Sequence, residues 1–244
     1  MARLRNGSQL PLVTLLPNMV TILGLCFGLT SIRFAFEDRY EIAAGLLVLA
    51  ALVDGMDGLL ARRLNAASPI GAELDSLSDF VCFGVAPALL VYRFGLEDLA
   101  GLGWVAALTF AICCCLRLAR FNVMAKDEEE DVSSSFVGVP APAGAMMGLF
   151  PVFLHLAEFW DMRQADWLIA LWILSVGGLM IARFRTFSLK SVKVSRENVV
   201  YILLGAAVVI GLMLTRLWLF CVVMTFVYAT LLVWGVISGR KKES

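Results

Sequence analysis

Four aspartates within apolar stretches carry the strongest chemical signal in this sequence. Asp54 and Asp57 lie three residues apart, and Asp75 and Asp79 lie four residues apart, so each pair shares one face of a helix. A carboxylate inside a membrane helix costs about 2.5 to 3.5 kcal/mol on insertion scales, and such residues are therefore functional candidates. Four carboxylates at one depth would repel one another unless a cation neutralised them. The spacing predicts a cation site.

The donor set indicates which cation this site would take. Carboxylate oxygens suit Mg²⁺ or Mn²⁺, as one or two ions, with Ca²⁺ as the alternative. His155 is the single histidine, which excludes a multi-histidine site, and the six cysteines lie in apolar runs without C-x-x-C spacing. We interpret the cysteines as small packing residues. Structural ion pairs with arginines such as Arg62 are the alternative interpretation of the acids.

Membrane helices are the elements that must position these acids. Hydrophobic residues make up 60% of the 244-residue chain, charged residues 16%, and the mean hydropathy is +0.85, beyond the range of soluble domains. We predict an all-α polytopic membrane helix bundle of about eight transmembrane helices. The expected spans are Asn18–Phe36, Glu41–Leu60, Gly71–Tyr92, Leu99–Leu118, Pro142–Leu156, Trp167–Ile181, Val199–Leu214 and Trp218–Ile237. Small residues at Gly24/Gly28 and Gly144/Gly148 predict close helix contacts.

Loop charges orient the predicted bundle. Eight spans place both termini on one face, which collects fifteen Lys and Arg residues against five on the other. Basic loops favour the cytoplasmic side, so we expect cytoplasmic termini and acids facing the cytoplasm, as in a prokaryotic inner membrane. The zero net charge gives no support to nucleic-acid binding.

The predicted organisation is a single integral membrane domain over residues 1–244. It comprises a catalytic six-helix core at 17–182, followed by a basic loop and two additional spans at 183–244. The last two spans carry no intramembrane acid. We therefore assign them to packing in the lipid bilayer or to oligomerisation, for example in a homodimer.

The acids and small residues together resemble the signature of the CDP-alcohol phosphotransferases. Residues 54–79 match the pattern D-x2-D-G-x2-A-R-x8-G-x3-D-x3-D at every fixed position. Further similarity points to the membrane-integral CDP-diacylglycerol serine O-phosphatidyltransferase branch, and it is carried by LPNMVT at 16–21, LDSLSDFVCFGVAPA at 74–88, RLARFN at 117–122 and FVGVPAP at 136–142.

The resemblance implies a role for each matched position. Asp54, Asp57 and Asp75 would bind the divalent ions, and Asp79 would complete the metal site and serve as the catalytic base. The residues expected to border the nucleotide are Asp54, Gly58, Ala61, Arg62, Gly71 and Asp75. On this basis the hydroxyl of L-serine attacks CDP-diacylglycerol, and the products are phosphatidylserine and CMP.

Polar residues near the predicted cytoplasmic helix ends are candidates for substrate binding. Arg117, Arg120 and Asn122 end the fourth span, where arginines bind a lipid phosphate or the serine carboxylate, or else anchor the helix by the positive-inside rule. Asn18 and Thr21 are candidates of the same kind, with a helix–helix hydrogen bond as the alternative.

Two rival functions are weighed against serine transfer. Glycerol 3-phosphate, an inositol phosphate or choline are alternative acceptors, because the aspartate motif handles only the shared donor. A cation transporter is the alternative from another class. Transporters usually place their acids along a path through the bilayer, whereas these acids cluster near one face.

Overall fold

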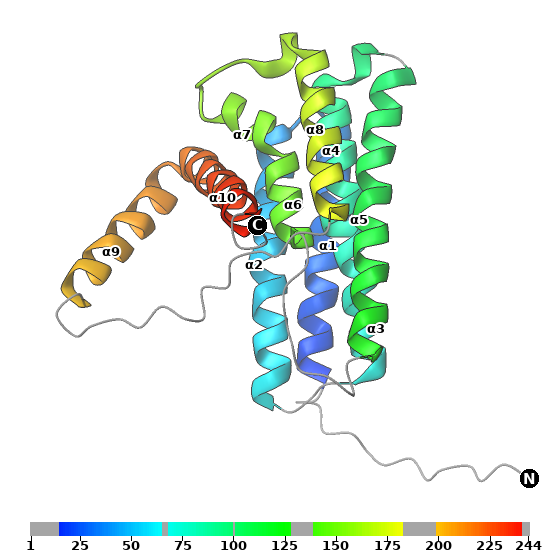
Figure 1. Ribbon diagram of the computed structural model, residues 1–244, viewed down its shortest axis with the longest axis vertical. Helices are drawn as coiled ribbons and strands as arrows, with labels where there is room; N and C mark the ends of the chain where they lie inside the picture. The colour runs from blue at the N-terminus through cyan, green and yellow to red at the C-terminus, as the bar shows by residue number, and fades with distance from the viewer. Residues whose placement is uncertain (1–14, 65–67, 100, 128–138, 183–198, 241–244) are drawn as a thin grey trace, which may run out of the picture.

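Helices make up all of the regular structure in the part of the chain that is described. The computed structural model describes residues 15–64, 68–99, 101–127, 139–182 and 199–240 (Figure 1). Five helices are long and apolar enough to cross a membrane, at Leu16–Phe36, Tyr40–Leu60, Pro69–Gly95, Gly101–Met124 and Leu217–Gly235. The predicted all-α class is confirmed.

The first two spans are α1 (Leu16–Phe36) and α2 (Tyr40–Leu64), which pack side by side as an antiparallel pair. A short turn joins them, in which Asp38 adopts a left-handed backbone conformation with φ of 56°. Because α2 runs toward the lower end of the bundle in Figure 1, its aspartates lie in the lower half of the molecule.

The third span is one continuous helix built from three segments. It consists of α3 (Pro69–Asp79), the π-helix η2 (Phe80–Val85) and α4 (Ala86–Gly95). Ser68 caps its start, where the hydroxyl accepts a hydrogen bond from the backbone N–H of Gly71 at 3.0 Å, and Pro69 occupies the first turn. The span therefore begins at the lower end with two acids and continues upward into the apolar core.

The remaining elements surround this span. The long helix α5 (Gly101–Asp127) packs against α8 (Asp166–Ile181), and short 3₁₀ turns at Glu97–Leu99 and Met162–Gln164 precede these helices. The predicted fifth span consists of two shorter helices, α6 (Ala141–Gly148) and α7 (Phe150–Leu156), which meet at Leu149. Pro151 lies in the first turn of α7, where its missing N–H costs no helical hydrogen bond.

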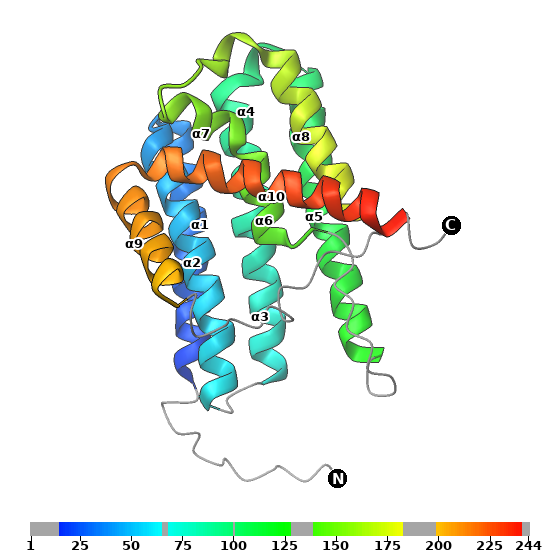
Figure 2. The ribbon, with the colours of Figure 1, turned by 60° about the vertical axis from the view of Figure 1, so that its left-hand side comes forward.

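The C-terminal helices lie differently from the rest. In Figure 1, α9 (Val199–Thr215) stands away from the bundle, and Figure 2 shows α10 (Leu217–Arg240) running crosswise over it. Helix α10 contacts α7 and α6. Hydropathy alone predicts that α10 is apolar enough for a span but says nothing about its direction.

Close packing of small residues holds the core together. A Cβ added at Gly28 would lie 2.7 Å from the Sγ atom of Cys82, and one added at Gly144 would lie 2.7 Å from the Sδ atom of Met180. The predicted close contacts at these glycines are confirmed. The largest fully buried side chains are Phe83, Phe110, Phe153, Leu47, Leu90, Leu96, Leu149, Ile169, Ile173 and Met180.

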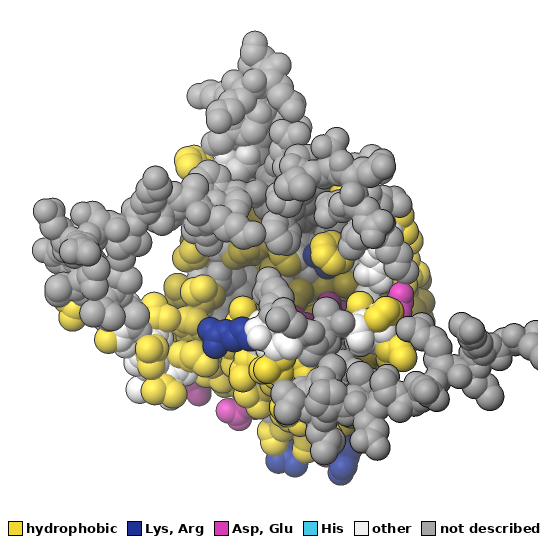
Figure 3. Space-filling view, turned by 90° about the horizontal axis from the view of Figure 1, so that it is seen from below, with side chains coloured by type: hydrophobic (Ala, Val, Ile, Leu, Met, Phe, Trp, Pro, Cys, Tyr) yellow, Lys and Arg dark blue, Asp and Glu magenta, His cyan; other side chains and the backbone are white. Residues whose placement is uncertain are grey.

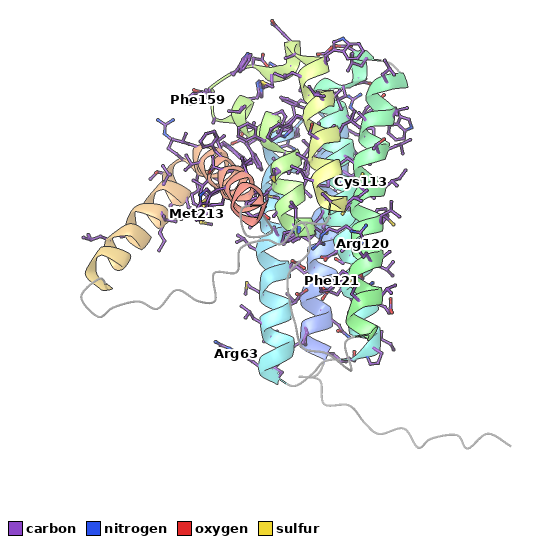
Figure 4. All side chains as sticks on the ribbon, in the orientation of Figure 1. Arg63, Cys113, Arg120, Phe121, Phe159 and Met213 are labelled. Carbon is purple, nitrogen blue, oxygen red and sulfur yellow. The ribbon has the colours of Figure 1, made fainter. Side chains whose placement is uncertain are left out.

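A charged network closes the upper end of the bundle, opposite the end where Figure 4 labels Arg63. Arg93 donates to Asp38 at 3.0 Å and to Glu97 at 2.6 Å, and the Tyr40 hydroxyl donates to Asp38 at 2.8 Å. The hydrogen bond from Tyr40, followed by the one from Arg93, lowers the pKa of Asp38. This end is thus fixed by ion pairs, whereas the lower end carries the cluster of acids.

Candidate functional site

Three of the four predicted acids meet between α2 and α3. One carboxylate oxygen from each of Asp54, Asp57 and Asp75 lies within 4.8 Å of the other two. Asp57 is the most enclosed of them, with 6% of its surface exposed. Three carboxylates at this separation form an all-oxygen donor set that suits a hard divalent cation.

Asp79 stands beside this trio. It is the last residue of α3, and its carboxyl group is in hydrogen-bonding contact with that of Asp54 across the helix pair. All four acids therefore belong to one continuous site. The arrangement separates three potential ligands from a fourth acid that remains within reach of them.

Helix α1 supports the acids without supplying one. The Thr21 hydroxyl donates to Oδ2 of Asp57 at 2.8 Å and also lies 3.1 Å from the carbonyl oxygen of Pro17. The backbone carbonyl of Thr21 accepts a hydrogen bond from the Ser78 hydroxyl at 3.3 Å. The helix–helix hydrogen bond expected of Thr21 is therefore present, and its partner is one of the four acids.

The π-helix that follows Asp79 is a further part of the site. π-Helical turns are rare and are frequently found at functional sites. The thiol of Cys82 donates to the carbonyl oxygen of Gly24 at 3.3 Å, next to the contact between Cys82 and Gly28. The segment directly after Asp79 is thus fixed against α1.

Sequence reasoning missed Ser78 and Cys82. Both are buried, and both donate to carbonyl groups of α1. Their four-residue spacing, beginning one position before Asp79, was a usable signal that one face of this helix packs against a neighbour.

A narrow internal space lies next to the acids. It has a volume of about 10 Å³ and is lined by Thr21, Gly24, Ala50, Val53, Asp54, Asp57, Ser78, Asp79, Cys82 and Phe83. A space of this size accommodates about one water molecule. A nucleotide is far larger, so it would have to approach the carboxylates from their open side.

The two glycines of the motif have different surroundings. Among the described residues, no atom outside the backbone of α2 lies within 4 Å of a Cβ added at Gly58, whereas a Cβ added at Gly71 would lie 2.8 Å from Asn18 Oδ1 and 3.0 Å from Ser68 Oγ. Gly58 therefore faces open space beside the acids. Gly71 is required by packing against α1 and by the helix cap. The side chains of Ala61 and Arg62 lie outside the described residues.

The predicted substrate-binding residues of α5 contact protein groups. Arg117 donates through Nε to the carbonyl oxygen of Val139 at 2.6 Å, and Arg120, labelled in Figure 4, donates to that of Ile181 at 2.9 Å. Each bond uses one of the five N–H donors of a guanidinium group. These arginines tie α5 to the start of α6 and the end of α8.

Asn122 is the α5 residue that contacts the acid-bearing helix. Its side-chain amide donates to the Ser76 hydroxyl at 2.7 Å, directly after Asp75 in the sequence. Seen from this lower end, Figure 3 shows acidic side chains among hydrophobic ones.

The helices that carry this site fall within a match to a known protein family. The sequence model of the CDP-alcohol phosphatidyltransferase family matches residues 14–178, from the start of α1 nearly to the end of α8. The chain belongs to this family. Helices α9 and α10 lie beyond the matched region, while α1 and all four acids lie within it.

Several curated relatives of this chain share one enzyme name. A CDP-diacylglycerol–serine O-phosphatidyltransferase of Mycobacterium leprae is 41% identical over 184 residues, which cover 74% of this chain and 60% of that protein. Proteins of the same name from Helicobacter pylori and Bacillus subtilis are 31% and 38% identical, over 80% and 54% of this chain and 81% and 71% of their own lengths. The chain spans about 60% of the length of the mycobacterial relatives that it matches.

Proposed function

We propose that this chain is a phosphatidylserine synthase. It would transfer the phosphatidyl group of CDP-diacylglycerol to the hydroxyl of L-serine and release CMP. The observation that carries the proposal is the meeting of Asp54, Asp57 and Asp75 within 4.8 Å, with Asp79 in contact beside them. The family match and the shared name of the relatives support this donor and this acceptor.

The residues of the trio fit a divalent ion, because they offer only carboxylate oxygens and lie close enough to share one. Asp54, Asp57 and Asp75 would hold Mg²⁺ or Mn²⁺, as one or two ions. A bound ion supplies positive charge that offsets the charge on the diphosphate and on departing CMP.

We assign the base to Asp79, which lies outside the trio but in contact with it. Its carboxylate accepts the proton of the serine hydroxyl as the hydroxyl oxygen bonds to the phosphorus that carries diacylglycerol. The bond from this phosphorus to the bridging oxygen breaks, and its electron pair leaves with CMP. Gly58 leaves open space in which the nucleotide would lie against α2. Arg117, Arg120, Asn122 and Asn18 are proposed to border the substrates.

Purified protein supplied with CDP-diacylglycerol, Mn²⁺ and one acceptor at a time tests this function. We expect CMP and phosphatidylserine with serine, and neither product with glycerol 3-phosphate, inositol phosphate or choline. Asp79→Asn should lower turnover by about 10² to 10⁴-fold, the usual contribution of a general base. Asp166→Asn, in the first turn of α8, is the matched control and should retain activity.

Other results would change the proposed acceptor, the base or the class of function. Product formation with another acceptor would replace serine and retain the phosphotransfer. Near-normal turnover in Asp79→Asn would remove the base assignment. No product with any acceptor, together with cation flux in protein-loaded vesicles, would favour the transporter.

The proposed setting is a prokaryotic inner membrane with the acids facing the cytoplasm. Eight spans would put both termini on that side, where the basic loops gather. In this arrangement α6 and α7 would form the fifth span together, α8 and α9 would form the sixth and seventh, and α10 would have to turn from the crosswise direction of Figure 2 to form the eighth. The basic loop at 183–198 lies outside the described residues, and oligomerisation through the last two helices stays a prediction.

A further inference from the structure

Thr21 occupies an unusual place, because it is bonded to both acid-bearing helices. Its hydroxyl bonds to Asp57 on α2, and its backbone carbonyl accepts from Ser78 on α3, next to Asp79. Only 7% of its surface is exposed. A shift of α1 at this point would therefore change how the two pairs of acids face each other.

The hydroxyl of Thr21 has one proton and two nearby acceptors. The carboxylate oxygen of Asp57 is both closer and charged, at 2.8 Å, compared with 3.1 Å for the carbonyl oxygen of Pro17. Hydrogen bonds to charged acceptors are roughly twice as strong as those between neutral groups. Asp57 is therefore the stronger partner whenever its carboxylate is ionised.

The Asp57 carboxylate accepts a side-chain hydrogen bond from a neighbouring helix. The donor is the Thr21 hydroxyl on α1, which lies 2.8 Å from Oδ2. A donor placed in this way fixes the rotation of a carboxylate and so determines which oxygen lone pairs are directed at the shared site.

We propose that Thr21 is a positioning residue that holds Asp57 in the orientation needed to bind a divalent cation. This inference deepens the proposed function and depends on the cation-binding role of Asp54, Asp57 and Asp75. Outer-shell partners of this kind typically change metal affinity by about 10 to 100-fold when they are removed. Thr21 itself would touch neither the ion nor the substrates.

Two substitutions separate the hydroxyl of Thr21 from its packing. Thr21→Val keeps the branched shape but removes the donor, whereas Thr21→Ser keeps the donor and removes a methyl group. Ser31→Ala is the matched control, because Ser31 is a fully buried hydroxyl of the same helix that donates to the carbonyl oxygen of Ala43 at 2.8 Å. Its bond also joins α1 to α2, but at a distance from the acids.

Binding of Mn²⁺ alone to the full chain in detergent is measured by electron paramagnetic resonance of the free ion. We expect Thr21→Val to raise the Kd for Mn²⁺ by about 10 to 100-fold. Thr21→Ser should stay within about threefold of the unmodified protein, and Ser31→Ala should leave the Kd unchanged even if it lowers the thermal unfolding temperature.

Three results would overturn the inference. They are an unchanged Kd in Thr21→Val, an equal loss of affinity in Thr21→Ser, or no binding of Mn²⁺ by the unmodified protein. Failure of serine-dependent CMP release with the predicted pattern of Mn²⁺ affinities would instead reject the proposed reaction and leave the role of Thr21 standing.

Discussion

The contact between Gly28 and Cys82 allows a quantitative test of how α1 supports the site. In Gly28→Ala the new Cβ would lie 2.7 Å from Sγ and 3.3 Å from Cα of Cys82, whereas ordinary van der Waals contacts begin at 3.4 Å. The Cα atom belongs to the backbone of η2, so a change of side-chain rotamer cannot relieve the whole contact. To restore ordinary contact, helix α1 and the π-helix must separate by up to about 0.7 Å, the difference between 2.7 and 3.4 Å, and overpacking of this kind costs about 1 to 3 kcal/mol.

The intrinsic helix preference of alanine over glycine opposes this cost by up to about 1 kcal/mol. Gly178→Ala measures that gain separately, because in the described part of the chain no atom outside the backbone of α8 lies within 4 Å of a Cβ added at Gly178. The two variants should therefore differ by about 1 to 3 kcal/mol in the free energy of unfolding, as measured by denaturant titration in mixed micelles. Adding Cys82→Ala to Gly28→Ala removes the sulfur and should restore part of the loss.

The same displacement of the π-helix should also lower the rate of turnover. Cys82 lies three residues after Asp79, and a misplacement of about 1 Å lowers turnover by as much as 10²-fold. Release of CMP should fall far more in Gly28→Ala than in Gly178→Ala. If both variants were equally stable and equally active, the proposed tight coupling between α1 and the acid-bearing helix would be refuted.

Three further predictions concern other parts of the molecule. Gly58→Ala should leave the free energy of unfolding unchanged or raise it by up to about 1 kcal/mol, because the new Cβ has open space around it. The same substitution should raise KM for CDP-diacylglycerol. An unchanged KM would argue against a nucleotide at this face of α2. Arg120→Met should lower the free energy of unfolding by about 1.5 to 3 kcal/mol, because it removes the hydrogen bond to the carbonyl oxygen of Ile181. Arg63→Met, at an exposed position, should lower it little. Equal unfolding free energies of the two variants would contradict the role of Arg120 in holding α5 against α8. Hydrogen bonds from Arg163 hold the pKa of Asp161 at about 2, so Asp161→Asn should lower stability by less than about 1 kcal/mol at pH 7, since 45% of the Asp161 side chain is exposed. That stabilisation is present above the unfolded-state pKa near 4 and is lost as the pH falls toward 2. The thermal unfolding temperatures of Asp161→Asn and the unmodified protein should therefore become equal only below about pH 4. Equal unfolding temperatures already at pH 6 would contradict this origin of the stabilisation.

The sequence allowed the acids to be placed well because their spacing obeys helix geometry. Asp54, Asp57 and Asp75 were expected on facing helices, and the short connection between α2 and α3 required those helices to be neighbours. The contacts of the α5 arginines were harder to predict, because their charge suggested phosphate binding or anchoring to the cytoplasmic side. The carbonyl groups that Arg117 and Arg120 contact belong to distant segments, and no local pattern identifies such partners.

Other features depend on tertiary contacts that hydropathy does not encode. The break between α6 and α7 at Leu149 follows a glycine and precedes a proline, yet the apolar character of the segment continues across it. The crosswise direction of α10 is set by its contacts with α6 and α7, since a mean hydropathy has no direction. The π-helical turn is equally invisible to a search for a 3.6-residue period.

The π-helix also affects how the third span tolerates insertions and deletions. In a regular α-helix, one inserted residue rotates everything after it by about 100°. A π-turn accommodates one extra residue locally, so the register of Pro69–Asp79 is separated from that of Ala86–Gly95. The acids can therefore keep their face toward α2 while the apolar half follows the packing of the core. Loss of one residue within 80–85 would therefore restore a regular helix and leave both halves facing their present partners, whereas the same deletion within Pro69–Asp79 would rotate part of the acid-bearing segment.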